Sequence, residues 1–542
     1  MTDGEQPAFE AAEGTGSVTR SVAGMGVAAA VSRAFGALRM VVIAAVLGTT
    51  FLGNTFQASN SVSNVLFDLL ASGALSAVLI PSFVDAFGRG ERRKAEELAG
   101  GILSLALAGL GVVTLLGVLF APALSRLLTS GVADPVIAAQ ERTLSTYLLR
   151  FFVPQILLYA VGAVSTAVLQ ARGRFALTAI APIGNTIVLV ASMVVFHVIA
   201  GSKPGLRLSS GARLTLALGG TLGVLGFIGV TTIGVLAMGF RFHFGVRRAI
   251  QDEHVRRLMR LSGWAMLQNS GVAILLAGAL IAAGGLAGGV VAYQLAMVVF
   301  NAPYGILSEP IHTAVLPRLS ADVVTGDHEG MRGAMRWAVD AMAALTFPVA
   351  ALLVGLCTPV MAILAFGEAS HGDGPQLLAA SLAGLALGIP AFGGFLLLTN
   401  ASYALGDSRT PAIVGITCSV LGAAGMIVAG HLVDGPGRLL AITGAHSAAQ
   451  LVSLVWLGWR LRPHVGPTLT MTQLRALVPA VGIGVAAWAV ERSLAPDGRA
   501  AKLAVVAVLS LLGLAVYALA LRLLRALPPR APLVHRPRAA LS

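Results

Sequence analysis

The chain has 542 residues, of which 56% are hydrophobic and 11% charged, and its mean hydropathy is +0.84. So few charges could not cover the surface of a soluble protein of this size, which predicts an integral membrane protein with the bilayer as its solvent. The net charge of +13 rests almost wholly on arginine. In a membrane protein this balance indicates cytoplasmic loops that face an anionic leaflet, and we expect no nucleic-acid partner.

Several motifs that would indicate other classes of protein are missing from the sequence. Cys357 and Cys418 lie in apolar segments without ligand-like neighbours, so we expect neither a disulfide framework nor a metal site. Residues 1–19 show no cleavable signal, so the first apolar segment is expected to be an anchor and the first span. No Walker, zinc-protease or serine-hydrolase motif is present. We therefore expect a transporter and not an enzyme, with no cofactor apart from a coupling cation or the membrane potential.

Apolar windows of about 20 residues predict an all-α membrane protein with about 14 transmembrane helices. In chain order they lie near 21–48, 55–86, 97–122, 144–170, 176–200, 213–240, 260–284, 287–317, 333–357, 376–403, 410–430, 437–460, 474–493 and 502–524. Basic residues gather in alternate loops, whereas the loops between them are short and neutral or mixed in sign. The positive-inside rule then places both termini in the cytoplasm.

An internal repeat divides the chain into two halves. The segment Ser72–Pro81 recurs as Ser308–Pro317, an offset of 236 residues (308 − 72) that also relates Pro154 to Pro390. Six spans separate the copies, so the two six-helix lobes should be parallel, with a site between them near the midplane. The predicted domains are a tail (1–20), an N-lobe (21–240), an amphipathic inter-lobe linker helix (241–260), a C-lobe (261–462), two further helices (463–525) and a basic tail (526–542).

Two arginines, Arg33 and Arg39, interrupt the first apolar segment. A cation at the bilayer centre costs at least ~2.5–3.5 kcal/mol, so it indicates a functional site that faces a wet interior. Six residues of helix separate the two side chains by about 9 Å along the axis and roughly 120° around it. We therefore expect them to point into a broad cavity that binds an anion, and not at a single partner.

The second span carries a polar stripe at helical spacing, formed by Gln57, Asn60, Asn64, Asp68 and Ser72. A continuous polar face on a membrane helix lines either a water-filled cavity or the interface with another helix, where it forms interhelical hydrogen bonds. We favour the cavity, and we expect Asp68 to neutralise Arg33 or Arg39 because unpaired charges in the membrane are costly.

In the eighth span, Glu309, Pro310 and His312 interrupt an apolar run. Pro310 removes a helix donor and predicts a break in the helix. Glu309 is either a carboxylate that couples transport to a proton or cation, or an acid at a loop end near the cytoplasmic surface. His312 is a second candidate for coupling, although a lone histidine is more often packed or hydrogen-bonded than part of a proton relay.

Four stretches near the start of the chain form a distinctive pattern: Ser32 to Arg39, Gly48-Thr-Thr, Asn54-Thr-Phe with Asn64, and Ser72 to Pro81. This pattern resembles the opening of the MurJ/MviN lipid II flippases, which belong to the multidrug/oligosaccharidyl-lipid/polysaccharide exporter superfamily. Further matches are Pro303-Tyr-Gly, Thr313 to Ser320, and Gly406 to Pro411.

The resemblance implies two six-helix lobes around a cationic cavity that binds the pyrophosphate and sugar-peptide of lipid II. It further implies a groove beside the two extra helices for the polyprenyl tail. Arg33 and Arg39 match two family arginines, and Asn54, Asn60, Asn64 and Asp68 are the other expected substrate contacts. The chain departs from the family at Asn54, Phe67, Ser72 and Ala296, where the family has Asp, Arg, Glu and Arg.

The sequence therefore predicts a monomeric flippase that moves lipid II outward by alternating access. Its expected partners are the lipid-linked precursor, the bilayer and cell-wall synthesis proteins. Two alternatives within the same superfamily are a flippase for another polyprenyl-linked glycan and a cation-coupled multidrug antiporter.

Overall fold

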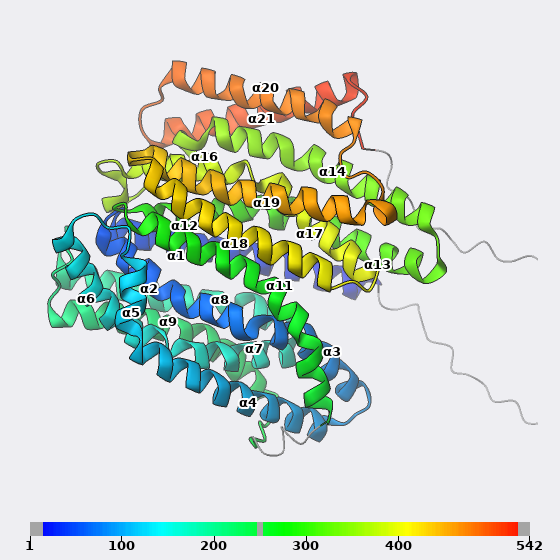
Figure 1. The fold of residues 1–542 in the computed structure, drawn as a ribbon, viewed down its shortest axis with the longest axis horizontal. Helices are drawn as coiled ribbons and strands as arrows, with labels where there is room; N and C mark the ends of the chain where they lie inside the picture. The colour runs from blue at the N-terminus through cyan, green and yellow to red at the C-terminus, as the bar shows by residue number, and fades with distance from the viewer. Residues whose placement is uncertain (1–14, 246–252, 529–542) are drawn as a thin grey trace, which may run out of the picture.

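The computed structural model describes residues 15–245 and 253–528, and these are almost entirely helical (Figure 1). The first half contains α1 (Thr15–Leu47), α2 (Phe51–Phe67), η1 (Asp68–Ser72), α3 (Gly73–Gly88), α4 (Arg92–Leu119), α5 (Ala121–Leu128), α6 (Pro135–Phe152), α7 (Gln155–Ala171), α8 (Phe175–Ala200) and α9 (Ser210–Ala237). The second contains α11 (Glu253–Gly284), α12 (Gly289–Pro303), η2 (Tyr304–Ser308), α13 (Glu309–Thr325), α14 (His328–Gly355), α15 (Cys357–Leu364), η3 (Gly367–Ser370), α16 (Gly374–Ala386), α17 (Ile389–Ala404), α18 (Arg409–Leu432) and α19 (Gly435–Val465). Two more helices follow, α20 (Met471–Leu494) and α21 (Arg499–Leu523).

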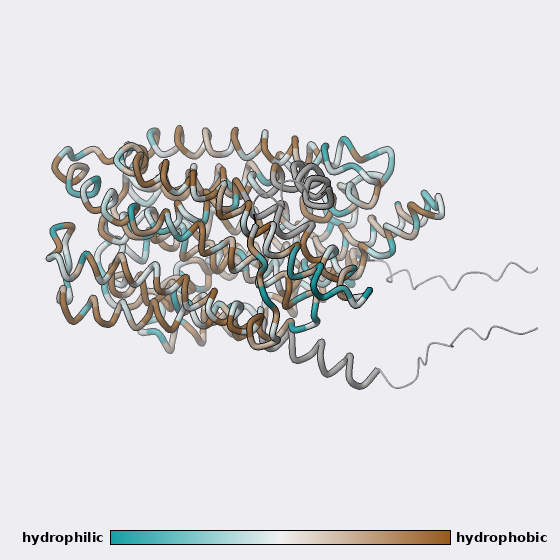
Figure 2. Tube along the Cα trace, turned by 90° about the horizontal axis from the view of Figure 1, so that it is seen from below, coloured by the Kyte–Doolittle hydropathy of each residue, from teal (hydrophilic) through white to brown (hydrophobic). Residues whose placement is uncertain are grey.

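The helices form two stacked lobes, with the N-lobe in the lower half of Figure 1 and the C-lobe above it. The last two helices, α20 and α21, lie on the outside of the C-lobe against α14 and α15. Hydrophobic residues run along the long sides of the molecule and hydrophilic residues concentrate toward its two ends (Figure 2). This pattern is that of a helix bundle whose flanks face lipid and whose ends face water.

The positions at which the helices break repeat between the two halves of the chain. The π-helical turns η1 (Asp68–Ser72) and η2 (Tyr304–Ser308) are separated by the offset of 236 residues seen in the sequence (304 − 68). The same offset relates both bounds of α4 to those of α14, and both bounds of α5 to those of α15. The prediction of two parallel six-helix lobes followed by two extra helices is therefore confirmed.

Ten helices of the described chain are long and apolar enough to cross a membrane, and the bent pair α16–α17 makes an eleventh. The other three predicted spans lie on α1, on α2–η1–α3 and on α11, whose side chains are described only in part. About 14 spans are consistent with this count. The predicted second span is not one straight helix, because the π-helical turn at Asp68–Ser72 divides it. The helix break that was predicted at Pro310 lies just N-terminal to this residue, in the π-helical turn Tyr304–Ser308.

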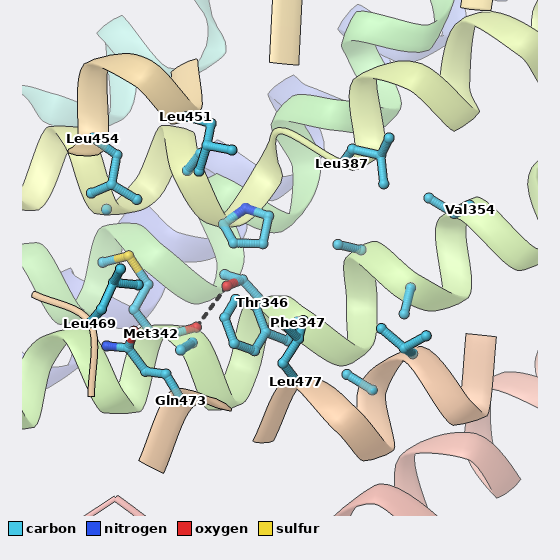
Figure 3. Close-up of a pocket in the computed structure, with 18 of the residues that line it drawn as sticks. Met342, Thr346, Phe347, Val354, Leu387, Leu451, Leu454, Leu469, Gln473 and Leu477 are labelled. Atoms are coloured by element: carbon cyan, nitrogen blue, oxygen red, sulfur yellow. Dashed lines mark hydrogen bonds between the residues drawn. The ribbon is translucent and has the colours of Figure 1, made fainter. Parts of the chain in front are cut away.

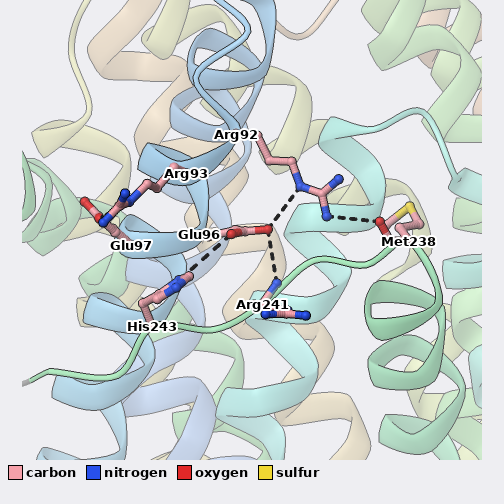
Figure 4. A network of polar contacts seen from close by, with 7 residues as sticks. All are labelled: Arg92, Arg93, Glu96, Glu97, Met238, Arg241 and His243. Atoms are coloured by element: carbon pink, nitrogen blue, oxygen red, sulfur yellow. Dashed lines mark hydrogen bonds and ion pairs between the residues drawn. The ribbon is translucent and has the colours of Figure 1, made fainter.

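The predicted amphipathic linker helix 241–260 is wrong for residues 241–245, which are not helical, and residues 246–252 lie outside the described chain. The segment 241–245 lies along α4 instead (Figure 4). There the Glu96 carboxylate accepts hydrogen bonds from the Arg92 guanidinium and the Arg241 backbone N–H. A Cβ at Gly100 would collide with the His243 backbone, so glycine permits this close approach. From Glu253 the chain is already part of α11.

The two lobes meet at both ends of the bundle. At the end that carries the loops 48–50, 129–134 and 285–288, hereafter the outer end, Gly131 packs on Gly285 and Thr49 on Gly288. At the opposite, inner end, α11 of the C-lobe packs on α3 and η1 of the N-lobe, and Ser270 donates a hydrogen bond to the Leu69 carbonyl. Both ends of the described chain lie at the inner end, as the right side of Figure 1 shows.

Candidate functional site

Arg39 lies in a pocket of about 270 Å³ in the N-lobe, hereafter the polar pocket. Its walls come from helices α1, α2, α7, α8 and α9, and α12 of the C-lobe adds one residue. Besides Arg39, the polar and aromatic residues of the lining are Gln57, Asn60, Ser61, Asn64, Tyr159, Asn185, Phe227 and Gln294. The lining thus contains one permanent cation and no carboxylate.

Three buried polar atoms of this pocket have no hydrogen-bond partner: Arg39 Nε, Asn60 Oδ1 and Asn185 Oδ1. Leaving a buried polar group unpaired costs about 1–3 kcal/mol, more for a charged one, so such groups indicate a ligand or water site. Guanidinium and amide N–H groups donate to phosphate and sugar oxygens, while the amide oxygens accept from hydroxyl groups. These unpaired groups are complementary to an anionic, hydroxyl-bearing ligand.

The polar stripe of the second span lines this pocket over part of its length. Gln57, Asn60 and Asn64 face Arg39, which fits the predicted cavity, whereas Asp68 begins the π-helical turn outside the lining. Gln294 of α12 donates a hydrogen bond to Ser61 Oγ at 2.7 Å, so the C-lobe closes one side. Whether these residues bind substrate stays a prediction.

Arg33 differs from the prediction, because it has one specific partner. Its Nη2 donates to Glu309 Oε2 at 2.8 Å, which links α1 of the N-lobe to α13 of the C-lobe. Both side chains remain about half exposed, at 51% and 52%. The guanidinium lies over Gly305 in the π-helical turn η2, where a Cβ would collide with it. The two arginines of α1 thus have different surroundings in this conformation, since Arg39 lines the polar pocket and Arg33 pairs with Glu309.

The residue Asn54, predicted to contact substrate, has a different position. It is buried at the outer end, where its amide nitrogen donates to the Leu286 carbonyl at 2.7 Å. Its Oδ1 accepts from the Val290 backbone N–H at 3.0 Å. Val290 is the position 236 residues after Asn54, so this contact lies at the pseudo-twofold axis between the lobes. In this conformation Asn54 holds the lobes together and does not face the polar pocket.

His312 is a buried, hydrogen-bonded side chain, in line with the more common role of a lone histidine. Its Nε2 lies 3.2 Å from the Gly393 carbonyl and its Nδ1 lies 3.5 Å from the Tyr304 hydroxyl. These contacts tie α13 to α17 and to η2. The neighbouring Glu309 is engaged by Arg33, so its carboxylate connects the lobes in this conformation.

At the two positions where the resemblance implied arginine in the family, Phe67 and Ala296, this chain has packed side chains. The Phe67 ring lies 5.6 Å from the ring of Tyr159, a residue of the polar-pocket wall. Ala296 is fully buried in α12. In the described lining of the polar pocket, Arg39 is the one cation, and its polar neighbours are chiefly side-chain amides.

A long apolar groove of about 1020 Å³ lies between the C-lobe and α20 (Figure 3). Its walls come mainly from α14, α17, α19 and α20, and among the labelled side chains are Met342, Phe347, Leu387, Leu454 and Leu477. Arg462, Gln473 and Thr468 are among its few polar lining residues. Such a groove fits an extended hydrocarbon chain better than a compact polar ligand.

Residues 43–509 match the family model described as "Lipid II flippase MurJ". This chain belongs to the MurJ family. A probable lipid II flippase MurJ from Rhizobium tropici is 26% identical over 389 residues, which are 70% of this chain and 69% of that protein. A solved lipid II flippase MurJ in an inward closed conformation is 15% identical, with a TM-score of 0.72 over 92% of this chain and 99% of that one.

A solved inward-facing transporter of the multidrug resistance MATE family has a TM-score of 0.58 at 15% identity, over 80% of this chain and 95% of that one. At these identities the structural likenesses establish the fold alone. The MurJ family accounts for the two lobes and the extra helices. Three polar-pocket residues, Tyr159, Asn185 and Gln294, were missed by the sequence analysis. None of the three belongs to a polar stripe at helical spacing, and only the packing of their helices against α1 and α2 brings them to Arg39.

Proposed function

We propose that this MurJ-family protein moves lipid II, a peptidoglycan precursor linked to polyprenyl pyrophosphate, across the bacterial cytoplasmic membrane by alternating access. The observation that carries the proposal is the polar pocket, with a buried guanidinium at Arg39, unpaired amides and no carboxylate. A diphosphate is the anion that best matches a guanidinium fork surrounded by hydrogen-bond donors. Cell-wall synthesis follows as the process this protein serves.

The apolar groove is the proposed place for the polyprenyl tail. It is open along the side of the molecule that α20 covers, and its lining is overwhelmingly hydrocarbon. A lipid whose tail stays in such a groove needs to move only its polar head through the protein. The head would then pass between the lobes while the tail remains in an apolar environment throughout.

Alternating access requires contacts between the lobes that form and break. Arg33–Glu309 is such a contact, because it joins α1 to α13 near the inner end and both side chains are accessible to solvent. An exposed ion pair contributes only about 0–1 kcal/mol, which is weak enough to be exchanged for a substrate phosphate. We propose that Arg33 alternates between Glu309 and the diphosphate, and that Glu309 acts in coupling through this exchange.

The predicted orientation, with both termini in the cytoplasm, is part of the proposal. In this orientation the inner end of the bundle faces the cytoplasm. That end carries the basic loops Arg89–Lys94 and Arg172–Arg174, as the positive-inside rule expects. We further propose that the protein acts as a monomer, driven by a coupling cation or the membrane potential.

The direct test is complementation of a bacterium from which its own lipid II flippase is depleted. The full-length chain should restore growth and should expose newly made lipid II to an externally added lipid II-cleaving enzyme. If the protein reaches the membrane and lipid II stays protected inside, the proposed cargo is wrong. Parallel measurement of other polyprenyl-linked glycans would then identify a different one.

Exchanging the charges of the inter-lobe pair tests the proposed role of Arg33. Arg33→Glu should strongly impair transport, and the double variant Arg33→Glu/Glu309→Arg should restore the ion pair but not transport. The reason is that the reversed pair still closes the lobes but offers the diphosphate a carboxylate on α1. Protease protection of the closed form and externally accessible lipid II are the two readouts. Full recovery of transport in the double variant would show that only the pairing matters.

A further inference from the structure

We propose that a second, separate site at the outer end of the N-lobe binds a phosphate or diphosphate group. The site is a pocket of about 590 Å³ between α5, α6 and α9, hereafter the outer basic pocket. Four arginines line it: Arg126, Arg142, Arg150 and Arg213. This proposal does not depend on the proposed function, since it concerns different residues and a different end of the molecule.

The arginines converge because of helical spacing on α6. Arg142, Thr146 and Arg150 follow one another at intervals of four residues, which places them on one face. Arg126 comes from the preceding short helix α5, and Arg213 from the first turn of α9. Three chain segments thus direct their cations into one recess, which a random distribution of surface arginines would not produce.

The acidic residues of this region do not neutralise the pocket. The Asp134 carboxylate caps α6 by accepting hydrogen bonds from the backbone N–H groups of Val136 and Ile137. Glu141 is buried on the opposite side of α6, where its Oε1 accepts from the Thr55 hydroxyl at 2.9 Å. In the described part of the chain no carboxylate lies within ion-pair distance of the four arginines, although the loop is mixed in sign in the sequence.

The contacts that orient these arginines within the protein leave guanidinium N–H donors available to a ligand. Arg213 lies over the Tyr147 ring at 5.6 Å, and its buried Nε has no hydrogen-bond partner. Arg142 donates through Nε to the Thr129 hydroxyl at 3.1 Å, which orients the rest of the guanidinium. Arg126 and Arg150 make no side-chain hydrogen bond or ion pair with the described residues. Uncompensated guanidinium groups in one recess repel one another unless an anion joins them.

The chemistry of the pocket favours a group with at least two negative charges. A carboxylate would neutralise one of four cations, whereas a phosphate monoester or a diphosphate can accept bidentate hydrogen bonds from two or more guanidinium groups.

Binding should be measured with purified full-length protein and inorganic pyrophosphate by calorimetry. The first variant is Arg126→Gln/Arg150→Gln, because both side chains are exposed and make no side-chain hydrogen bond or ion pair with the described residues, so the fold should be unaffected. Its matched control is Arg89→Gln/Arg93→Gln, which removes two exposed arginines at the inner end with the same change in net charge. A second variant, Arg142→Gln/Arg213→Gln, removes the two oriented guanidinium groups.

We expect saturable binding that weakens at least tenfold in each pocket variant and less than twofold in the control. A second measurement, retention of phosphatidic acid over phosphatidylcholine in native mass spectrometry, distinguishes the two sources of phosphate. Loss of lipid retention in the pocket variants assigns the site to a lipid headgroup, and loss of pyrophosphate binding alone assigns it to a soluble phosphate. If neither measurement differs between the pocket variants and the control, the proposal is overturned.

Discussion

Replacing Arg39 with alanine should lower lipid II transport by about 10- to 100-fold, because charge-assisted hydrogen bonds to a diphosphate are worth ~1.5–3 kcal/mol. Arg39 is the only cation in the lining of the polar pocket, so no neighbouring residue can replace it there. Arg33→Ala should have a smaller effect, since Arg33 is half exposed and lies outside that pocket. The double variant Arg33→Ala/Arg39→Ala should abolish transport. The measurement is the rate at which lipid II becomes accessible from outside.

The matched control is Arg475→Ala, an exposed arginine on the membrane helix α20. It should leave transport and membrane insertion unchanged. Arg39→Lys should recover only part of the activity, because an ammonium group cannot form the two parallel hydrogen bonds of a guanidinium. Transport at the wild-type rate in the double alanine variant would contradict the proposed role of both arginines.

The sequence was sufficient to predict the architecture because the repeat leaves marks in the chain itself. The prolines Pro154 and Pro390 and the matched Ser72 and Ser308 segments lie at one offset, and the helix breaks follow it. The polar residues of α2 were also visible, since a stripe at helical spacing stands out in an apolar segment. These features are local in sequence, and local features are what pattern analysis detects.

The contacts between distant segments could not be predicted in the same way. Asn54 has the composition of a substrate contact, yet its amide satisfies backbone groups of the 284–290 loop, 230 residues or more away. Similarly, the loop around α5 and α6 is mixed in sign, and only the fold shows that Glu141 turns inward while Arg142 turns outward. The burial of each side chain, which decides whether a charge is compensated, depends on packing that a single sequence does not reveal.

Substituting Gly285 with alanine should hold the outer end open and strongly reduce transport. A Cβ at this position would collide with the Gly131 carbonyl of the N-lobe and would lie 2.6 Å from Arg438 Nη2. The Gly131 carbonyl and the loop at Gly285 cannot shift far, because the hydrogen bonds of the neighbouring Asn54 side chain fix the same junction between the lobes. The lobes must therefore separate at this end, and a transporter that cannot close one side cannot complete its cycle.

The change in conformation can be measured with spin labels at Ser130 and Ser370, two exposed residues at the outer end, one on each lobe. We expect a longer and broader distance distribution in Gly285→Ala than in the wild type. The control is Gly205→Ala, in the loop between α8 and α9, where a Cβ would meet no atom within 4 Å and the backbone is not left-handed. It should leave both the distances and transport unchanged. Unaltered distances in Gly285→Ala would mean that the contact between Gly131 and Gly285 does not control closure, and the outer seal would then have to rest on Asn54 and the Thr49–Gly288 contact.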